Sequence, residues 1–239
     1  MPNPSRQPSR MRERLSGLWR LCRQQFHRDH QVFGNFPPGP YRVILDIGAH
    51  AGEFARRAQR HFRPERVCLV EADPELAESL RHRFGSLPGY KVVAAAIADR
   101  TGEMDFHINE HRAASSLLPM HGQTRTLFDR PFREQKVVKV ATVTLDELFL
   151  REGWDQVDLM KVDIQGGERA LLVGGQRALR QVRVIYLEVL FQQLYENCAL
   201  FCELHETLSR GGFHLQFLDD FRRGKEGDLI YGNACYRRV

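Results

Sequence analysis

From residue 41 onward, short continuous apolar runs alternate with longer stretches in which apolar residues recur every three or four positions. Runs of the first kind are typical of strands buried on both faces of a parallel sheet, and stretches of the second kind are typical of amphipathic helices. The strands predicted in this way are 43–47, 66–70, 90–98, 158–164, 182–190, 214–218 and 228–237. The pattern predicts an α/β fold, with a mainly parallel seven-stranded sheet, helices on both faces and an antiparallel C-terminal hairpin.

The intervening helices are predicted from their apolar stripes and their end signals. Leu76, Leu80 and Phe84 form such a stripe behind Asp73-Pro74, where Asp73 suits the N-cap and Pro74 the first helical position. The other predicted helices are 52–62, 167–179 and 197–209. Each lies between two predicted strands, as β-α units require.

Residues 103–144 interrupt this alternation. Strands are predicted at 103–108 and 136–144, and the stretch 109–135 between them is polar and irregular. Because long loops inside compact domains are often functional, we expect this stretch to border the substrate, with Ser115 and Ser116 as contacts. Its arginines and histidines would suit a polyhydroxylated or anionic molecule, while a simple solvated loop is a nearly equal alternative.

Residues 1–40 are predicted to form a basic N-terminal arm, separate from one domain at 41–239. Residues 1–30 hold seven arginines, one Glu and one Asp, a surplus of five (7 − 2) that equals the net charge of +5 of the whole chain. The near-neutral remainder argues against a nucleic-acid surface. Residues 11–33 have helical spacing, and a Pro- and Gly-rich linker follows. We favour a helix packed on the domain, and the alternative is a basic helix that covers the site or touches a membrane or other anionic surface.

Length and cysteine usage limit the class of protein. A chain of 239 residues can bury a core that needs no covalent cross-links. The five cysteines are odd in number and show no C-x-x-C or zinc spacing. No apolar run approaches the roughly 20 residues of a membrane-spanning helix, and the N-terminus lacks the apolar stretch of a secretory signal. We therefore expect a cytoplasmic protein in a reducing compartment.

The strongest local signal is the turn after the first predicted strand, Asp46-Ile47-Gly48-Ala49-His50-Ala51-Gly52. Gly48 allows the backbone to turn sharply and to approach a ligand closely, because no Cβ intervenes. The helix that begins beyond it presents free N–H groups and the positive end of its dipole. In open α/β sheets ligands bind at such carboxyl ends of strands.

Acidic residues at successive strand ends indicate which ligand this is. The turn lacks the G-x-G-x-x-G pattern of a pyrophosphate site, and Asp46 suits a cation better than a diphosphate. Glu71, 25 residues later, can accept both hydroxyls of a ribose, and Asp99 after the third strand can accept from an adenine amino group. Ribose, adenine and a cationic methionine moiety together describe S-adenosylmethionine. Singly each acid could be a helix cap or a solvated turn, but three in register favour the cofactor.

Taken in order, these motifs resemble the FkbM family of methyltransferases over about residues 41–220. The matching stretches are Asp46 to Gly52, Glu71-Ala72-Asp73-Pro74, Ala96-Ile97-Ala98-Asp99, Thr142 to Asp146, Asp158 to Glu168, and Glu188. The resemblance implies a Rossmann-like class I methyltransferase fold and O-methylation of a hydroxyl on a sugar, glycan, lipid-linked saccharide or natural product. His50 stands where Asn is commoner in the family, and Gln165 where Glu is commoner.

The predicted cofactor-binding residues are Asp46, Gly48, His50, Gly52, Glu71, Ala72, Ala98 and Asp99. Asp163, which ends the fourth parallel strand, is the first choice for the general base, and Glu188 and Glu168 are the other catalytic candidates. Glu168 could instead only favour its helix N-terminus, and Glu188 could pair with an arginine of the arm. Gln165 joins the two serines as a predicted substrate contact.

A divalent metal is an alternative to a base. It would bind Asp163 and a second carboxylate and lower the pKa of the acceptor hydroxyl. We do not expect a metal, because three or more oxygen ligands would be needed and only scattered acids are visible.

Two rival functions fit parts of the pattern. A nicotinamide-dependent oxidoreductase shares the topology but needs the missing glycine pattern and a second substrate domain. A non-catalytic nucleoside-binding scaffold could keep the fold without the reaction. Binding of labelled S-adenosylmethionine separates the first rival from a methyltransferase, and activity on hydroxylated acceptors separates the second.

Overall fold

The computed structural model describes residues 33–128 and 133–239. The chain divides into two units, Met1–Phe36 and Pro37–Val239, and the fold described below is that of the second. The predicted arm with its helix at 11–33 lies almost wholly outside the described residues, so its structure, its role and its boundary at residue 40 stay predictions.

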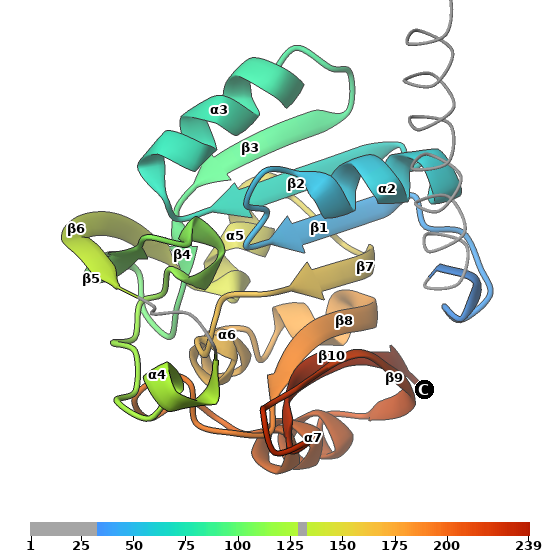
Figure 1. The fold of residues 1–239 in the computed structure, drawn as a ribbon. Helices are drawn as coiled ribbons and strands as arrows, with labels where there is room; N and C mark the ends of the chain where they lie inside the picture. Colours follow the sequence, from blue (N-terminus) through green and yellow to red (C-terminus); the bar gives the residue numbers. More distant parts are fainter. Residues whose placement is uncertain (1–32, 129–132) are drawn as a thin grey trace, which may run out of the picture. The chain divides into compact units, whose positions relative to one another are not determined.

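A seven-stranded sheet forms the centre of this unit, in the order β3-β2-β1-β7-β8-β10-β9 (Figure 1). In that order its strands are Tyr90–Ala94, Arg66–Glu71, Val43–Ile47, Val157–Val162, Val182–Leu190, Leu229–Arg238 and Phe213–Arg223. The first five pair in parallel, and β10 is antiparallel to both of its neighbours. The predicted mainly parallel sheet with an antiparallel C-terminal hairpin is confirmed.

Helices cover both faces of this sheet. They are α2 (Glu53–Phe62), α3 (Pro74–Phe84), α5 (Leu145–Glu152), α6 (Glu168–Gly174) and α7 (Phe201–Arg210). Apolar residues of α5, α6 and α7 share one core cluster with Ile185 and Leu187 of β8. Tyr186 lies between these two and faces the other way, and its ring stacks on Phe54 of α2 at 6.2 Å. Because the connections between the five parallel strands cross over the faces of the sheet, the carboxyl ends of these strands all lie at one edge of it.

Local sequence signals mark the ends of the helices. One helix with such signals was not predicted, because the apolar pattern alone did not indicate it. Asp73 caps α3 as predicted, because its side chain accepts two backbone N–H groups of the first turn. Helix α5 was not predicted, although Thr144 accepts the N–H of Glu147 at its start and Gly153 ends it with φ 61°. A Thr followed three residues later by Glu, with a glycine after the helix, is typical of the two ends of a helix.

The predicted strand 90–98 is wrong as a single buried strand. β3 ends at Ala94, Ala95 donates its N–H to the carbonyl of Glu71, and the chain then enters β4 (Ala96–Ile97). β4 belongs to a second sheet of order β4-β6-β5, with β5 at Gly102–Asn109 and β6 at Glu134–Val143. β3 is the partly buried edge strand of the main sheet. The apolar run continues without interruption across Ala95, so the sequence gives no sign of the break between β3 and β4.

Two predicted helices are shorter than the pattern suggested. α6 ends at Gly174, where a Cβ would lie 2.4 Å from the carbonyl oxygen of Ala98, and only a separate 3₁₀ turn follows at Ala178–Gln181. α7 begins at Phe201, because the residues before it form a loop whose Glu196 donates its N–H to the carbonyl of Pro119. The irregular stretch between β5 and β6 contains a 3₁₀ turn at Arg112–Ala114 and the short helix α4 (Thr124–Leu127).

Candidate active site

The predicted catalytic and cofactor residues gather where the parallel strands end. Asp46 and Gly48 lie at the end of β1, Glu71 ends β2, and Asp163 follows β7. β1 pairs with both β2 and β7, and β8, which carries Glu188, pairs with β7. The carboxyl ends of these four adjacent strands form one rim, the edge at which open α/β sheets bind ligands (Figure 1).

Gly48 is required by the protein's own backbone. Its φ is +71°, and a Cβ at this position would lie 1.8 Å from the carbonyl oxygen of Asp163. The N–H of Asp163 also donates to the carbonyl of Ile47 at 3.0 Å. The turn after β1 and the turn after β7 are therefore in direct contact, and a side chain at Gly48 would push them apart.

The rest of the glycine turn leads into α2. His50 has φ +49°, and its backbone N–H donates to Glu71 Oε2 at 2.7 Å. Gly52 is the N-cap of α2 with φ +74° and offers no side-chain cap, and a Cβ there would lie 2.6 Å from the ring of Phe84. The free N–H groups of the first turn of α2 thus lie beside the rim.

Glu71 is buried at the rim and is held by backbone donors. Its side chain accepts the N–H of His50 on Oε2 and the N–H of Asp73 on Oε1, at 2.7 and 2.8 Å. Burial raises the pKa of Glu71, and these two hydrogen bonds oppose the shift. Each oxygen keeps a lone pair for a further donor. Ala72, the next residue, is half-buried.

Asp46 lies beneath the rim, next to a partly buried lysine. Its side chain is 0% exposed, and neither oxygen has a hydrogen-bond donor among the described residues. Lys161 Nζ lies 3.5 Å from Asp46 Oδ1 and donates to the carbonyl of Gly48 at 2.7 Å. Burial raises the pKa of Asp46, and Lys161 opposes the shift. Lys161 therefore supplies a positive charge next to Asp46, where the sequence analysis expected a cationic ligand.

Asp99 lies in a different setting from the one predicted. It follows β4 of the small sheet, so the assumption that it ends the third strand of the main sheet is wrong. Its side chain is exposed and lies 3.6 Å from Arg100. Ala98 is fully buried and donates its N–H to the carbonyl of Val143. Contact of these two residues with an adenine stays a prediction.

The three predicted catalytic acids lie close together at the ends of β7 and β8. The side chain of Asp163 is 37% exposed, and its Oδ2 lies 3.7 Å from Lys161 Nζ. Glu168 is buried at the start of α6, where Oε1 accepts the N–H of Ile164 and Oε2 has no hydrogen-bond partner among the described residues. Burial raises the pKa of Glu168 to about 7, with a further contribution from Asp163. Burial also raises the pKa of Glu188 well above its usual value, and the charges of Asp163 and Glu168 add to the shift.

Gln165 joins these acids to a tyrosine that the sequence reasoning missed. Its Nε2 lies 2.7 Å from Asp163 Oδ1 and 2.7 Å from Glu188 Oε2. Its Oε1 accepts the hydroxyl of Tyr195 at 2.5 Å. Tyr195 is 2% exposed and comes from the loop between β8 and α7. No sequence pattern singles it out, because its partners are 30 residues away or more.

The predicted substrate serines are buried and hold the 109–135 stretch in place. Ser115 Oγ accepts the N–H of Asn109 at 3.0 Å. Ser116 Oγ donates to the carbonyl of Gln165 at 2.7 Å and accepts the N–H of Leu118. These contacts give both hydroxyls a structural role, and a contact of either serine with substrate stays a prediction.

Arg112, from the same stretch, was also missed. It donates to Asp73 Oδ2, and its other terminal nitrogen lies 2.5 Å from Glu75 Oε2. Asp73 is almost wholly buried and caps α3 at the same time. One arginine therefore joins the 109–135 stretch to the start of α3, beside Glu71.

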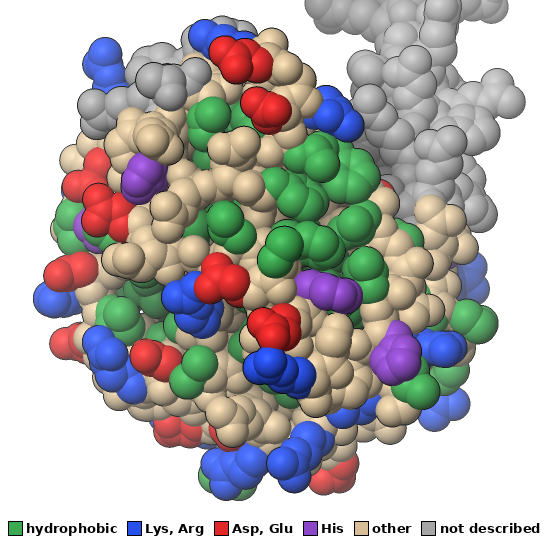
Figure 2. All heavy atoms as spheres, turned by 90° about the horizontal axis from the view of Figure 1, so that it is seen from below, with side chains coloured by type: hydrophobic (Ala, Val, Ile, Leu, Met, Phe, Trp, Pro, Cys, Tyr) green, Lys and Arg blue, Asp and Glu red, His purple; other side chains and the backbone are tan. Residues whose placement is uncertain are grey.

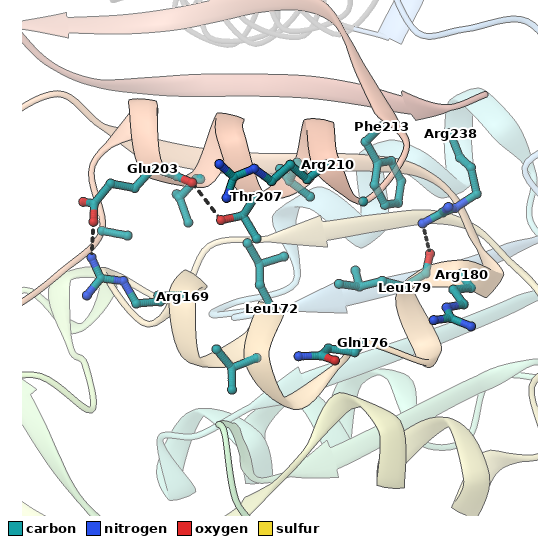
Figure 3. A pocket seen from close by; sticks show the side chains of 15 residues that line it. Arg169, Leu172, Gln176, Leu179, Arg180, Glu203, Thr207, Arg210, Phe213 and Arg238 are labelled. Atoms are coloured by element: carbon teal, nitrogen blue, oxygen red, sulfur yellow. Dashed lines mark hydrogen bonds and ion pairs between the residues drawn. The ribbon is translucent and has the colours of Figure 1, made fainter.

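A groove of about 490 Å³ lies between α6 and α7 and contains none of the predicted site residues (Figure 3). Two of its arginines are held by contacts within the protein. Arg169 pairs with Glu203 at 2.6 Å, and Arg238 donates to the carbonyl of Leu179 at 2.7 Å (Figure 3). We therefore do not assign the reaction to this groove.

Figure 2 shows the face of the molecule over α7 and the β9–β10 hairpin, where acidic and basic side chains lie next to one another and hydrophobic side chains gather beside them. Arg210 and Glu206 on α7 form one such pair at 2.5 Å. No helix among the described residues is long and apolar enough to cross a membrane. Among the same residues, no three His, Cys, Asp or Glu side chains are grouped as metal ligands.

Comparison with known sequences decides the family. The sequence profile described as Methyltransferase FkbM domain matches residues 46–215, a range that contains the glycine turn, Glu71 and all three catalytic candidates. The chain belongs to the FkbM methyltransferase family. This FkbM methyltransferase is 30% identical over 200 residues to the 2-O-methyltransferase NoeI of Sinorhizobium fredii, an alignment that covers 82% of this chain and 81% of NoeI.

Two further likenesses are more distant. The antimetabolite synthetase AmbE of Pseudomonas aeruginosa is 25% identical over 211 residues, which cover 76% of this chain but 10% of AmbE. The crystal structure of an S-adenosylmethionine-dependent methyltransferase from Mesorhizobium loti matches with a TM-score of 0.51 and 11% sequence identity, over 88% of this chain and 98% of that chain. At that identity the structural likeness shows the fold alone.

The chain is therefore an S-adenosylmethionine-dependent methyltransferase with a Rossmann-like class I fold, as the sequence predicted. The family decides against the nicotinamide-dependent rival. The rim fits the cofactor, because Glu71 has acceptor capacity left in a buried position and the start of α2 has no side-chain cap.

Proposed function

We propose that this FkbM methyltransferase methylates a hydroxyl of a sugar, glycan or natural product, with Asp163 as the general base. The name of NoeI, a 2-O-methyltransferase, supports oxygen as the atom methylated. The observation that supports Asp163 as the general base is its position. Its side chain is 37% exposed, and its backbone contacts the glycine turn after β1.

Glu71, the Gly48 turn and the start of α2 would hold the cofactor. Glu71 faces the rim with lone pairs suited to ribose hydroxyls, and the start of α2, which has no side-chain cap, leaves backbone N–H groups beside it. S-adenosylmethionine supplies a methyl group that is already activated by its sulfonium. The protein has to align the acceptor oxygen with that methyl group and to take up a proton.

Asp163 is suited to take up this proton. Gln165 occupies its Oδ1, which leaves Oδ2 for the acceptor hydroxyl. Lys161, whose side chain is 13% exposed, lies with its Nζ 3.7 Å from Oδ2. Burial alone would lower the pKa of Lys161, but Asp46 and Asp163 outweigh it and keep the lysine charged.

Glu188 and Glu168 are less suited to act as bases. Glu168 is 2% exposed, which keeps an acceptor from its carboxylate, and neither acid lies in the turn that contacts Gly48. We propose that they shape the site beside Asp163. The 109–135 stretch would border the acceptor, because Ser116 ties it to the turn that carries Gln165.

The proposed chemistry uses a carboxylate base and no metal. Turnover is expected to be unchanged after dialysis against EDTA, and a loss restored by Mg²⁺ or Mn²⁺ would overturn this part. We also propose a reducing cytoplasm as the place of action, because Cys68, Cys198, Cys202 and Cys235 are free thiols.

The test is methyl transfer from radiolabelled S-adenosylmethionine to a panel of hydroxylated acceptors, with matched amines as controls. The account predicts label on a hydroxyl compound. Label on amines alone would overturn O-methylation. Tight binding of the donor without transfer to any member of a broad panel would favour the non-catalytic scaffold.

A further inference from the structure

Gln165 lies at the centre of the acid cluster, and its amide satisfies three neighbours at once. The nitrogen lies 2.7 Å from Asp163 Oδ1 and 2.7 Å from Glu188 Oε2, and the oxygen lies 2.5 Å from the hydroxyl of Tyr195. An amide nitrogen carries two hydrogens, so it can donate one to each acid. The reverse orientation would place the amide oxygen against two carboxyl groups, so the chemistry fixes which way the amide points.

The backbone also holds Gln165 in an unusual conformation. Its φ is +54°, which is uncommon for a residue with a side chain, and Gly166 follows with φ +95°. The carbonyl of Gln165 accepts the hydroxyl of Ser116 at 2.7 Å. Both the side chain and the main chain of this residue are therefore held by specific partners.

In this chain position 165 holds a neutral donor, although Glu is commoner there in the family. Asp163 and Glu188 lie on either side of it, and Glu168 raises the negative charge nearby. A glutamate at 165 would offer only acceptors to two other acids and would add a third negative charge in contact with them. A glutamine donates to both and adds no charge.

Gln165 also joins the acids to the 109–135 stretch. The Tyr195 hydroxyl lies 3.1 Å from the carbonyl of Ala114, which belongs to that stretch. Tyr195 forms an isolated bridge with Met120, and Glu196 donates its N–H to Pro119 at 2.9 Å. The described part of the stretch is therefore joined to Gln165 through Tyr195 as well as through Ser116.

We propose that Gln165 is a positioning residue, whose amide holds Asp163 and Glu188 at the rim and connects them through Tyr195 to the 109–135 stretch. This rests on the proposed function, in which Asp163 takes the proton and the stretch borders the acceptor. Gln165 acts through Asp163 and Glu188 and takes no proton itself.

The test measures the protonation of Glu188 directly, without an acceptor. The carboxyl carbon of Glu188 is followed by ¹³C NMR against pH in protein labelled at the side-chain carboxyls of Glu, and the signal is assigned by its loss in Glu188→Gln. The variants are Gln165→Leu, Gln165→Glu and Tyr195→Phe. Gln176→Glu, an exposed position on the α6–α7 groove, makes the same chemical change away from the acids.

In Gln165→Leu the midpoint of Glu188 is expected to rise by about one pH unit, because the anion loses a donor. In Gln165→Glu it rises further, because a like charge is added. Tyr195→Phe gives a smaller rise, and Gln176→Glu gives none. A residue with a merely structural role would not move this midpoint. An unchanged midpoint in a folded Gln165 variant overturns the proposal, and Tyr195→Phe carries the test if both Gln165 variants fail to fold.

A kinetic readout separates this proposal from the proposed function. With the best acceptor of the panel, Gln165→Glu is expected to lower kcat about 10- to 100-fold at pH 8 and to recover part of it near pH 5.5, since a protonated carboxyl regains one donor. Gln165→Leu should show no such recovery. Recovery in both variants, or in neither, would contradict the positioning role. Failure of the wild type to bind S-adenosylmethionine would overturn the proposed function, while the NMR titration would still decide the role of Gln165.

Discussion

The two halves of the rim are built in different ways. At β1 and β2 the cofactor half is held by backbone: Gly48 contacts the carbonyl of Asp163, and Glu71 accepts two main-chain N–H groups. At β7 and β8 the acid half is held by side chains, with Gln165 donating to both acids. We propose that backbone contacts fix the position of the cofactor, and that side-chain contacts position the proposed base and its acceptor.

The difference also predicts which property a substitution in each half should change. A change in the cofactor half should act on folding or on binding of the donor, because it alters backbone packing or a ribose acceptor. A change in the acid half should act on turnover and on the pH dependence of turnover or stability, because it alters charge and leaves the backbone contacts in place. The variants below test this division, from the largest expected effect to the smallest.

Asp163→Asn should give the largest effect. The amide keeps an oxygen for Gln165 but cannot take a proton, so kcat should fall about 10²- to 10⁴-fold. Initial rates with saturating S-adenosylmethionine measure this. Glu226→Gln serves as the control, because it removes a negative charge at an exposed position far from Asp163 in the sequence. Wild-type turnover in Asp163→Asn would remove Asp163 as the base.

Gly48→Ala should destabilise the folded protein by about 3 kcal/mol or more. The new Cβ would meet the Asp163 carbonyl oxygen at 1.8 Å, and the left-handed φ adds a penalty of its own. Urea unfolding measures the change. Gly122→Ala is the matched control, because a Cβ there meets nothing within 4 Å. Equal stability of the two variants would show that the two turns do not need this contact.

Glu168→Gln should stabilise the protein in a pH-dependent way. Burial raises the pKa of Glu168 from 4.5 to about 7 in the folded state, so the folded protein holds a proton that the unfolded chain has released. Wild-type stability should therefore fall as the pH rises from about 4.5 to 7, and the penalty persists above that. The variant should match the wild type near pH 4.5 and exceed it at pH 8 by up to about 3 kcal/mol. Urea unfolding at both pH values measures this, and a constant difference would contradict it.

The sequence predicts the cofactor half better than the acid half, for a physical reason. Gly48, Gly52 and the Asp73 cap are local signals, because each acts on backbone within a few residues. The strand order follows from repeated β-α units. The break at Ala95 was hidden, since the apolar residues on both sides fit either sheet, and Asp99 was misplaced as a result.

The contacts of the acid half join segments that are far apart in the sequence. Gln165 meets Glu188 across 23 positions and Tyr195 across 30. Such pairings depend on the fold and leave no spacing pattern. The identities of Asp163, Glu168 and Glu188 could be predicted from the strand ends, whereas the amide between two of them could not.

Calorimetric titration of S-adenosylhomocysteine, the demethylated product, into Glu71→Ala and Asp163→Asn tests the division most directly. Glu71→Ala should weaken binding by about 1–3 kcal/mol, because ribose hydroxyls would lose a buried acceptor. Asp163→Asn should bind within a few-fold of the wild type. Wild-type affinity in Glu71→Ala, or an equal loss in both variants, would contradict a rim with a separate cofactor half and acid half.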